Sequence, residues 1–106
     1  MIKFLKKIFG AGERPDFAVL VSAGAIVVDV RTPEEYRMGH IKQSVNIPLQ
    51  ALSGKVAELA KKKKPIITVC RSGSRSGMAK NMLRRQGVEA YNGGPWTSFQ
   101  HYRKQV

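Results

Sequence analysis

The residues best suited to chemistry lie in one segment, Cys70-Arg71-Ser72-Gly73-Ser74-Arg75-Ser76, which holds the only cysteine of the chain. It follows a short apolar run at 66–69 and precedes a stretch whose apolar residues have helical spacing. A helix start directs unpaired backbone N–H groups and a partial positive charge at the loop before it. Gly73 and the small serines let the backbone curl, so that several N–H groups can converge into an anion-binding nest.

The charge around Cys70 favours a thiolate over a thiol. Arg71 and Arg75 add permanent positive charge, and both cations and helix starts lower the pKa of a cysteine. We therefore predict that Cys70 is an accessible nucleophile at neutral pH. A lone cysteine is more often a small buried hydrophobe, but such a residue needs no arginines and glycine beside it. The residues predicted to bind the arriving anion are Arg71, Ser72, Gly73, Ser74, Arg75 and Ser76.

Strands alternate with helices along the rest of the chain. Short apolar runs rich in β-branched residues predict strands at 25–30, 44–48, 66–69 and 88–91. Apolar spacing and stop signals predict helices at 15–24, 33–38, 53–61, 76–86 and 96–102. Thr32, Pro33 and Glu35 form a full helix start, with a capping residue, a proline at the first position and a capping box. A turn is expected at Gly93-Gly94.

This order of elements predicts an α/β fold. Strands joined by helices, with no hairpin signal between them, imply a mostly parallel sheet with helices on both faces. Ligands of such sheets bind at the carboxyl ends of the strands. Cys70 stands at the end of the third predicted strand, which is such a place.

The composition narrows the classes of partner. Nineteen Lys and Arg against seven Asp and Glu leave a net charge of +12, which attracts small oxyanions, nucleic acid, membrane surfaces and acidic proteins alike. The chain has no recognisable nucleic-acid reading module, so no specific nucleic-acid partner is expected. The lysine run 61–64 precedes Pro65 and suits the negative end of a helix dipole. An acidic protein remains a candidate partner.

Cysteine and histidine usage argues against a metal site or other cofactor. One cysteine excludes an internal disulfide and any site built from several cysteines. His40 and His101 lie far apart and lack the spacing of helical metal ligands. We expect no metal and no cofactor.

Residues 1–14 are predicted to be a basic amphipathic arm and linker, and residues 15–106 one domain. Lysines interrupt the apolar residues of the arm, unlike a secretory signal, and no stretch has the length of a membrane span. Packing of 1–10 on the domain is favoured over contact with a membrane surface, because ten residues offer little apolar area. A cytoplasmic location is expected by default.

The loop sequence resembles the active-site loop of the rhodanese family of sulfurtransferases, in which six residues correspond to Cys70 through Arg75. The resemblance extends over roughly 15–103, and its other motifs occur in the expected order and spacing. These motifs are Asp29-Val30-Arg31, Glu34-Glu35-Tyr36, Gly39-His40-Ile41, Asn46-Ile47-Pro48, and Gly93-Gly94 with Trp96.

The resemblance implies a small rhodanese-like domain with a mostly parallel sheet of four to five strands. It also implies a two-step reaction, in which Cys70 takes the outer sulfur of thiosulfate or another donor as a persulfide and passes it to cyanide or a thiol. Arg71, Arg75 and the loop N–H groups would hold the donor and the persulfide. Asp29 and Arg31 are better read as structural support that ties neighbouring segments by charge-assisted hydrogen bonds.

Two departures from the family and two rival functions accompany this interpretation. The arm occupies the place of the family's usual first strand, and the chain before Gly93 is shorter than in many members. A cysteine phosphatase or arsenate reductase on the same fold would have its arginine one place later, where this chain has Ser76. The other alternative is a persulfide carrier or docking module without turnover. Thiosulfate sulfurtransferase activity is the favoured prediction.

Overall fold

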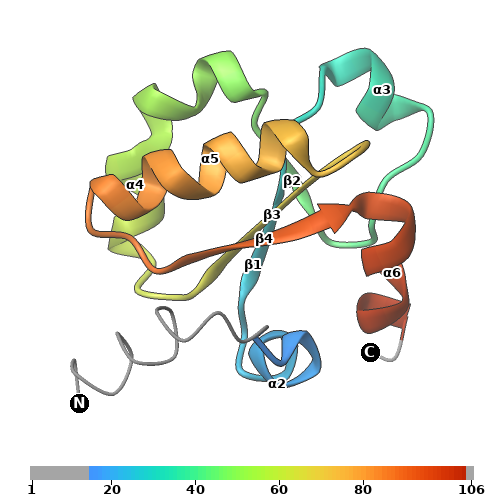
Figure 1. Cartoon of the computed structure of the whole chain (residues 1–106), viewed down its shortest axis with the longest axis horizontal. Coiled ribbons are helices and arrows are strands. Elements are labelled where there is room, and N and C mark those ends of the chain that lie inside the picture. Colours follow the sequence, from blue (N-terminus) through green and yellow to red (C-terminus); the bar gives the residue numbers. More distant parts are fainter. Residues whose placement is uncertain (1–14, 105–106) are drawn as a thin grey trace.

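Four parallel strands form the centre of the structure, in the order β2-β1-β3-β4 (Figure 1). The computed structural model describes residues 15–104, and every strand range below lies within them. The fold prediction of a parallel α/β sheet is thereby confirmed. The strands are β1 (Ile26–Asp29), β2 (Val45–Asn46), β3 (Ile66–Cys70) and β4 (Ala90–Pro95).

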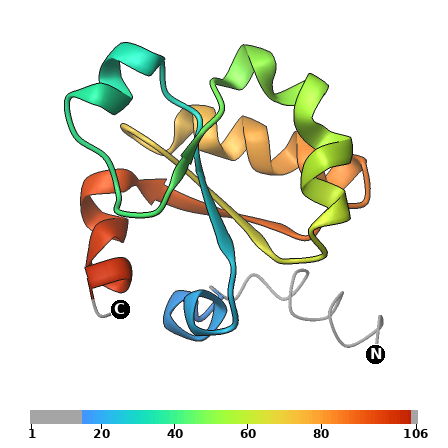
Figure 2. The ribbon, with the colours of Figure 1, turned by 180° about the vertical axis from the view of Figure 1, so that it is seen from behind.

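Helices cover both faces of this sheet (Figures 1 and 2). Helix α5 lies on one face with η1 and α4, and helices α2 and α6 lie on the other, which is the three-layer arrangement expected when helices connect parallel strands. The helices are α2 (Phe17–Ser22), α3 (Pro33–Arg37), the 3-10 helix η1 (Leu49–Lys55), α4 (Val56–Lys61), α5 (Ser74–Arg85) and α6 (Trp96–Lys104).

Alternation along the strands divides the core into two layers and decides where the cysteine points. In β3, Ile67 and Val69 pack in the layer with α2 and α6, whereas Ile66 and Cys70 pack in the layer with α5. Successive strand residues face opposite sides of a sheet. Because β3 ends on the α5 side, the sulfur lies beneath the first turn of that helix.

Local capping explains the two short helices that precede the site. Asp16 accepts a hydrogen bond from the Val19 amide at the start of α2. The Thr32 side chain accepts from the Glu35 amide, while the Glu35 carboxylate accepts from the Thr32 amide, so the predicted capping box is present. This box fixes the position of the Glu35 carboxylate, which matters for the loop.

Two predicted helices have different boundaries in the structure. The helix expected at 53–61 is a 3-10 helix up to Lys55 and an α-helix only from Val56. The expected helix 76–86 begins earlier, at Ser74, because Gly73 adopts a left-handed φ of 98° and turns the chain directly into the helix.

The last strand also differs from the prediction. The expected turn at Gly93-Gly94 is part of β4, which continues to Pro95. The pairing register shifts between Thr68 and Val69, so the strand accommodates one extra residue as a bulge instead of turning away. β4 therefore extends along β3 as far as Cys70, and it brings its own side chains to the loop.

The predicted basic arm and linker at 1–14, which would occupy the place of the family's usual first strand, lie outside the described residues. Within 15–104 the sheet has four strands, where the resemblance implied four to five. None of the helices there has the length and apolar character needed to cross a bilayer.

Candidate active site at the end of strand β3

The Cys70 sulfur is the point on which the loop amides converge. The Gly73 amide donates a hydrogen bond to Sγ at 3.0 Å, and the Ser76 amide donates another at 3.3 Å. The left-handed conformation of Gly73 folds the loop back over the strand end, so that the first turn of α5 points its free N–H groups at the sulfur. The predicted nest exists, and its occupant in this structure is Sγ itself.

The expectation that Cys70 is accessible was wrong. The residue has an exposed fraction of 0% and packs in the apolar layer that faces α5, beneath the loop amides. The Ser76 hydroxyl lies 3.3 Å from Sγ and is itself fully buried. The polar groups within hydrogen-bond distance of the sulfur are the Gly73 and Ser76 amides and the Ser76 hydroxyl.

The surroundings of the sulfur lower the pKa of Cys70. Burial by itself disfavours the charged thiolate and raises the pKa, but hydrogen bonds from the Ser76 side chain and from the amides of Ser76, Gly73 and Ser72 outweigh it. The sequence predicts a lowered pKa from the helix start and from the charges of Arg71 and Arg75 alike. In the structure the causes that lower it are hydrogen bonds to the sulfur. The direction agrees with the prediction.

Arg75 is not a free cation at the mouth of the site. Its guanidinium donates to both carboxylate oxygens of Glu35, at 2.8 and 3.1 Å. The Arg75 hydrogen bonds and the Thr32 amide hold the pKa of Glu35 at about 2, so this carboxylate stays charged. The pair joins α3 to the first turn of α5. It also leaves Arg71, which is exposed and makes no ion pair within 15–104, as the cation open to an arriving anion.

The remaining predicted loop residues are Ser72, Gly73 and Ser74, which lie at the outer side of the loop. Ser72 and Ser74 are exposed, and the Ser72 hydroxyl accepts a hydrogen bond from the Ser74 amide at 3.4 Å. Gly73 is half-buried and forms the turn. Of the predicted segment, Gly73 and Ser76 contact Sγ directly, whereas the side chains of Arg71, Ser72 and Ser74 are exposed and that of Arg75 bonds to Glu35.

Asp29 and Arg31 lie at the end of the neighbouring strand β1 and bond each other. The Arg31 Nη2 and Nε atoms donate to the Asp29 carboxylate, with the shortest distance 2.8 Å, and both side chains are almost fully buried. Arg31 also donates to the backbone oxygen of Gly39 at 2.7 Å, and its guanidinium lies 4.6 Å from the Trp96 ring centre. These contacts tie β1 to the segment after α3 and to α6.

Asn92 is a site residue that sequence reasoning missed. It comes from β4, and its side-chain oxygen accepts a hydrogen bond from the Ser76 hydroxyl at 2.7 Å. Its amide nitrogen donates to the Gly73 backbone oxygen at 3.1 Å. The missed signal was the bulge at 93–94, because the expected turn there would have carried Asn92 away from the loop.

Thr68 fixes the other side of the same arrangement. Its buried hydroxyl lies 2.8 Å from the Ser76 backbone oxygen and 3.2 Å from that of Tyr91. One hydroxyl therefore connects the first turn of α5 to β4 across β3. Ser76 is therefore held through its backbone oxygen by Thr68 and through its side chain by Asn92.

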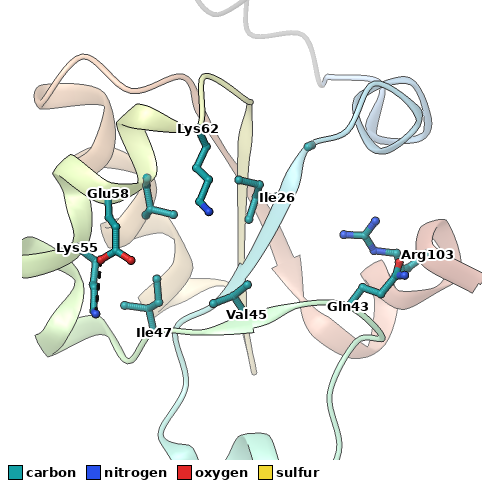
Figure 3. A pocket seen from close by; sticks show the side chains of 10 residues that line it. Ile26, Gln43, Val45, Ile47, Lys55, Glu58, Lys62 and Arg103 are labelled. Atoms are coloured by element: carbon teal, nitrogen blue, oxygen red, sulfur yellow. Dashed lines mark ion pairs between the residues drawn. The ribbon is translucent and has the colours of Figure 1, made fainter.

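A separate groove of about 390 Å³ lies at the β2 edge of the sheet (Figure 3). Lys62, which follows the end of α4, and Arg103 of α6 extend over it, and Lys55 pairs with Glu58 at 3.6 Å on its rim. None of its lining residues belongs to the Cys70–Ser76 segment. Its apolar floor consists of Ile26, Val45, Ile47 and Leu59.

Within the described residues, no group of three or more His, Cys, Asp or Glu side chains lies together in a way that could hold a metal ion. Fold and site together define a parallel α/β domain with a cysteine in an anion-binding loop.

Comparison with known proteins identifies the family. The model of the rhodanese-like domain matches residues 14–100, so the chain belongs to the rhodanese-like domain family. The thiosulfate sulfurtransferase PspE of Escherichia coli is 35% identical over 72 residues, which are 67% of this chain and 69% of that protein. The uncharacterized protein YqhL of Bacillus subtilis is 41% identical over 69 residues, 64% of this chain and 54% of that protein.

The fold comparison agrees. A solved structure of "rhodanese with anions from E. coli" superposes with a TM-score of 0.65 at 30% identity, covering 70% of this chain and 89% of that one. The rhodanese resemblance of the loop sequence is thereby confirmed. Membership in a family with a named thiosulfate sulfurtransferase supports sulfur transfer in general.

Proposed function

We propose that this chain is a sulfurtransferase that moves a sulfane sulfur from thiosulfate, or from a persulfide donor, to cyanide or a thiol through a persulfide on Cys70. The observation that carries the proposal is the convergence of the Gly73 and Ser76 amides on the sulfur of the only cysteine. Donors arranged in this way stabilise a negative sulfur, both as the attacking thiolate and as the persulfide formed from it.

In the first step, the Cys70 thiolate attacks the outer sulfur of thiosulfate. A new S–S bond forms, the original S–S bond breaks, and sulfite leaves with the electron pair. The negative charge then lies on the outer sulfur of the Cys70 persulfide. Hydrogen bonds to the sulfur lower the pKa of Cys70, so the thiolate attacks directly in this proposal and no general base is assigned.

In the second step, cyanide or a thiolate attacks the outer sulfur. Thiocyanate or a new persulfide forms, and Cys70 leaves as a thiolate that its amide donors stabilise. No electron acceptor is required, because the sulfane sulfur moves at constant oxidation level. A reducing compartment such as the cytoplasm would keep the thiol free between turnovers, and the cytoplasmic location belongs to the same proposal.

The loop residues divide these tasks. Arg71 attracts and orients the donor anion from the open side, while Arg75 is held by Glu35 and keeps the loop in place. Ser72, Gly73 and Ser74 supply the curled backbone, and Ser76 supplies an amide and a hydroxyl at the sulfur. Asp29 and Arg31 support the neighbouring strand end.

Burial of Cys70 sets a condition on this proposal. Sγ has no exposed area, so the loop must separate slightly for the outer sulfur of a donor to reach it. The amides of the first turn would then bind the outer sulfur in place of Sγ. A small acceptor such as cyanide suits such a confined site better than a bulky reagent.

Phosphatase or arsenate reductase activity is disfavoured by the loop length. The arginine that would clasp a tetrahedral oxyanion stands one place too early, at Arg75, and its fork of donors is already occupied by Glu35. The cradle is filled by one sulfur atom, which leaves little room for four oxygens.

A carrier or docking role without turnover is the second candidate, and the groove at the β2 edge favours it. Val45 is 45% exposed there, and Lys62 and Arg103 lie over an apolar floor. Such a surface complements an acidic partner protein, which the net charge of +12 would also attract. This role could accompany sulfur transfer.

Thiocyanate formation from thiosulfate and cyanide tests the enzyme proposal. The wild-type chain is expected to turn over many times, the Cys70→Ala variant is expected to be inactive, and Arg85→Ala, at the far end of α5, should retain the wild-type rate. Loading of a single sulfur without turnover would favour the carrier instead. Equal rates for the wild type and Cys70→Ala would contradict both roles of the cysteine.

A further inference from the structure

The Ser76 hydroxyl lies between two acceptors but carries only one proton. Its oxygen is 2.7 Å from Asn92 Oδ1 and 3.3 Å from Cys70 Sγ. A serine hydroxyl can donate one hydrogen bond and accept others. The two neighbours therefore compete whenever both need a proton.

The side-chain amide of Asn92 has a fixed orientation. Its oxygen accepts from the Gly94 amide at 2.9 Å, and its nitrogen donates to the Gly73 backbone oxygen at 3.1 Å. Reversing the amide would place a donor against a donor and an acceptor against an acceptor. The oxygen thus faces Ser76, and it can only accept.

The two ionisation states of Cys70 satisfy this network differently. In the thiol state the S–H group donates to the Ser76 oxygen, and Ser76 donates to Asn92, so both contacts are hydrogen bonds. In the thiolate state the S–H proton is gone. Ser76 must then either turn its proton to the sulfur and leave Asn92, or stay with Asn92 and leave the charged sulfur with its amide donors only.

We propose that Asn92 is a positioning residue that competes with the Cys70 sulfur for the single proton of the Ser76 hydroxyl, and so limits how strongly that hydroxyl stabilises the thiolate. The inference rests on the proposed role of Cys70 in sulfur transfer. It concerns the strength of the nucleophile and not its identity.

This competition has a use in a two-step reaction. A sulfur that is stabilised too strongly as a thiolate attacks slowly, although it leaves readily. Asn92 keeps the sulfur a better nucleophile in the first step. When the persulfide has formed, the negative charge moves to the outer sulfur, and the Ser76 proton can return to Asn92.

The charged groups near the loop do not enter this network. Arg75 on α5 is paired with Glu35 of α3, Asp29 and Arg31 bond each other at the end of β1, and Arg71 is exposed. The hydrogen bonds of the Ser76 and Asn92 side chains go to each other, to Sγ, and to backbone groups of Gly73 and Gly94. Their effect on the thiol is therefore separable from that of the ion pairs.

The test is the pKa of the Cys70 thiol, read from thiolate absorbance across pH, in the wild type and in Asn92→Leu. Leucine has a similar shape but no hydrogen-bond acceptor. Asn92 is exposed, so the change should leave the fold intact. The pKa is expected to fall by about half to one unit, the equivalent of one hydrogen bond. An unchanged or raised pKa would overturn the proposal. A raised pKa is the result expected if the substitution acts only by removing the hydrogen bond to the Gly73 backbone oxygen, because the loop amides would then withdraw from the sulfur.

A double-mutant cycle locates the effect in Ser76. In the Ser76→Ala background, Asn92→Leu is expected to cause no fall in the thiol pKa, since there is no hydroxyl proton to release. The same fall in both backgrounds would overturn the competition. Should Ser76→Ala fail to fold, the sign of the shift in Asn92→Leu alone still decides. These titrations need no sulfur transfer, so failure of the proposed function would appear separately, as absent thiocyanate formation by the wild type.

Discussion

Glu35 and Arg75 lie 40 positions apart in the sequence and meet in a two-point ion pair, with distances of 2.8 and 3.1 Å. The Glu35 carboxylate is already positioned by its capping contact with Thr32. The pair therefore links a rigid helix start to the first turn of α5, which carries the amide that points at Cys70. A local capping box thus helps to position the loop.

Replacing Glu35 by Gln should reduce stability in a pH-dependent way. Pairing lowers the pKa of Glu35 from 4.5 to about 2, so its contribution is present above about pH 4.5 and is lost as the pH falls toward 2. Because both side chains are partly exposed, we expect a loss of no more than about 1 kcal/mol at pH 7. Urea unfolding at pH 7 and pH 2 should show that the difference between wild type and variant disappears at the lower pH.

The matched control is Glu34→Gln, an exposed carboxylate of the same helix outside the Arg75 pair. It removes the same charge from the same helix start. Equal effects of the two substitutions at pH 7 would assign the loss to the helix dipole and contradict the role of the ion pair.

Removing the positive charge of Arg71 should weaken donor capture. Arg71 is exposed directly after Cys70 and makes no ion pair within 15–104, so its attraction for thiosulfate acts through water and is worth about 1 kcal/mol. Arg71→Ala should raise the KM for thiosulfate about fivefold, and added salt should reduce the difference. Arg85→Ala lowers the net charge equally, and an equal rise in KM there would mean that only the overall charge matters.

Gly73→Ala should distort the nest without a steric clash. Gly73 has a φ of 98°, and an added Cβ would lie 3.5 Å from the Gly94 Cα, an ordinary contact. The change therefore strains the backbone, at about 1 kcal/mol or more. We expect lower stability and a higher thiol pKa as the amides withdraw from Sγ.

Gly87→Ala controls for backbone strain in that experiment. Gly87 has a φ of 83° and open space around a Cβ, but it lies at the opposite end of α5. It should lose similar stability with no change in the thiol pKa. If the thiol pKa shifted equally in both variants, the shift would not be caused by the local geometry of Gly73, and the prediction would be contradicted.

Gly93→Ala tests whether close packing places β4 against the loop. An added Cβ would lie 2.8 Å from Ile67 Cγ2 and 2.9 Å from Val69 Cγ1, so backbone or core must shift. Overpacking of this kind destabilises by about 1–3 kcal/mol. Gly54→Ala, where a Cβ meets nothing within 4 Å, should be close to neutral in the same unfolding assay. If Gly93→Ala is equally neutral, the close approach does not hold β4 in place.

The sequence predicted the parts of this site that are local. Cys70, the curl at Gly73 and the capping box of Thr32 and Glu35 depend on residues within a few positions of each other, and their chemistry can be read directly. The expected parallel sheet followed from alternating elements in the same way. What remained open were contacts across the sheet, such as Glu35 with Arg75.

The bulge in β4 explains the most consequential miss. Gly93-Gly94 is typical of a turn, and nothing local indicates that Gly93 fits against Ile67 and Val69 and lets the strand continue. Asn92 therefore looked like a residue before a turn. Burial of Cys70 was missed for a related reason, because the tightness of the loop depends on Ser76 being held by Thr68 and Asn92.

The most direct measurement of the central claim is the mass of the intact chain after incubation with thiosulfate and removal of excess donor. The wild type should gain one sulfur atom and lose it again when cyanide is added, while Cys70→Ala should keep its original mass. A wild-type chain whose mass does not change under these conditions would contradict the assignment of Cys70 as the sulfur-bearing residue.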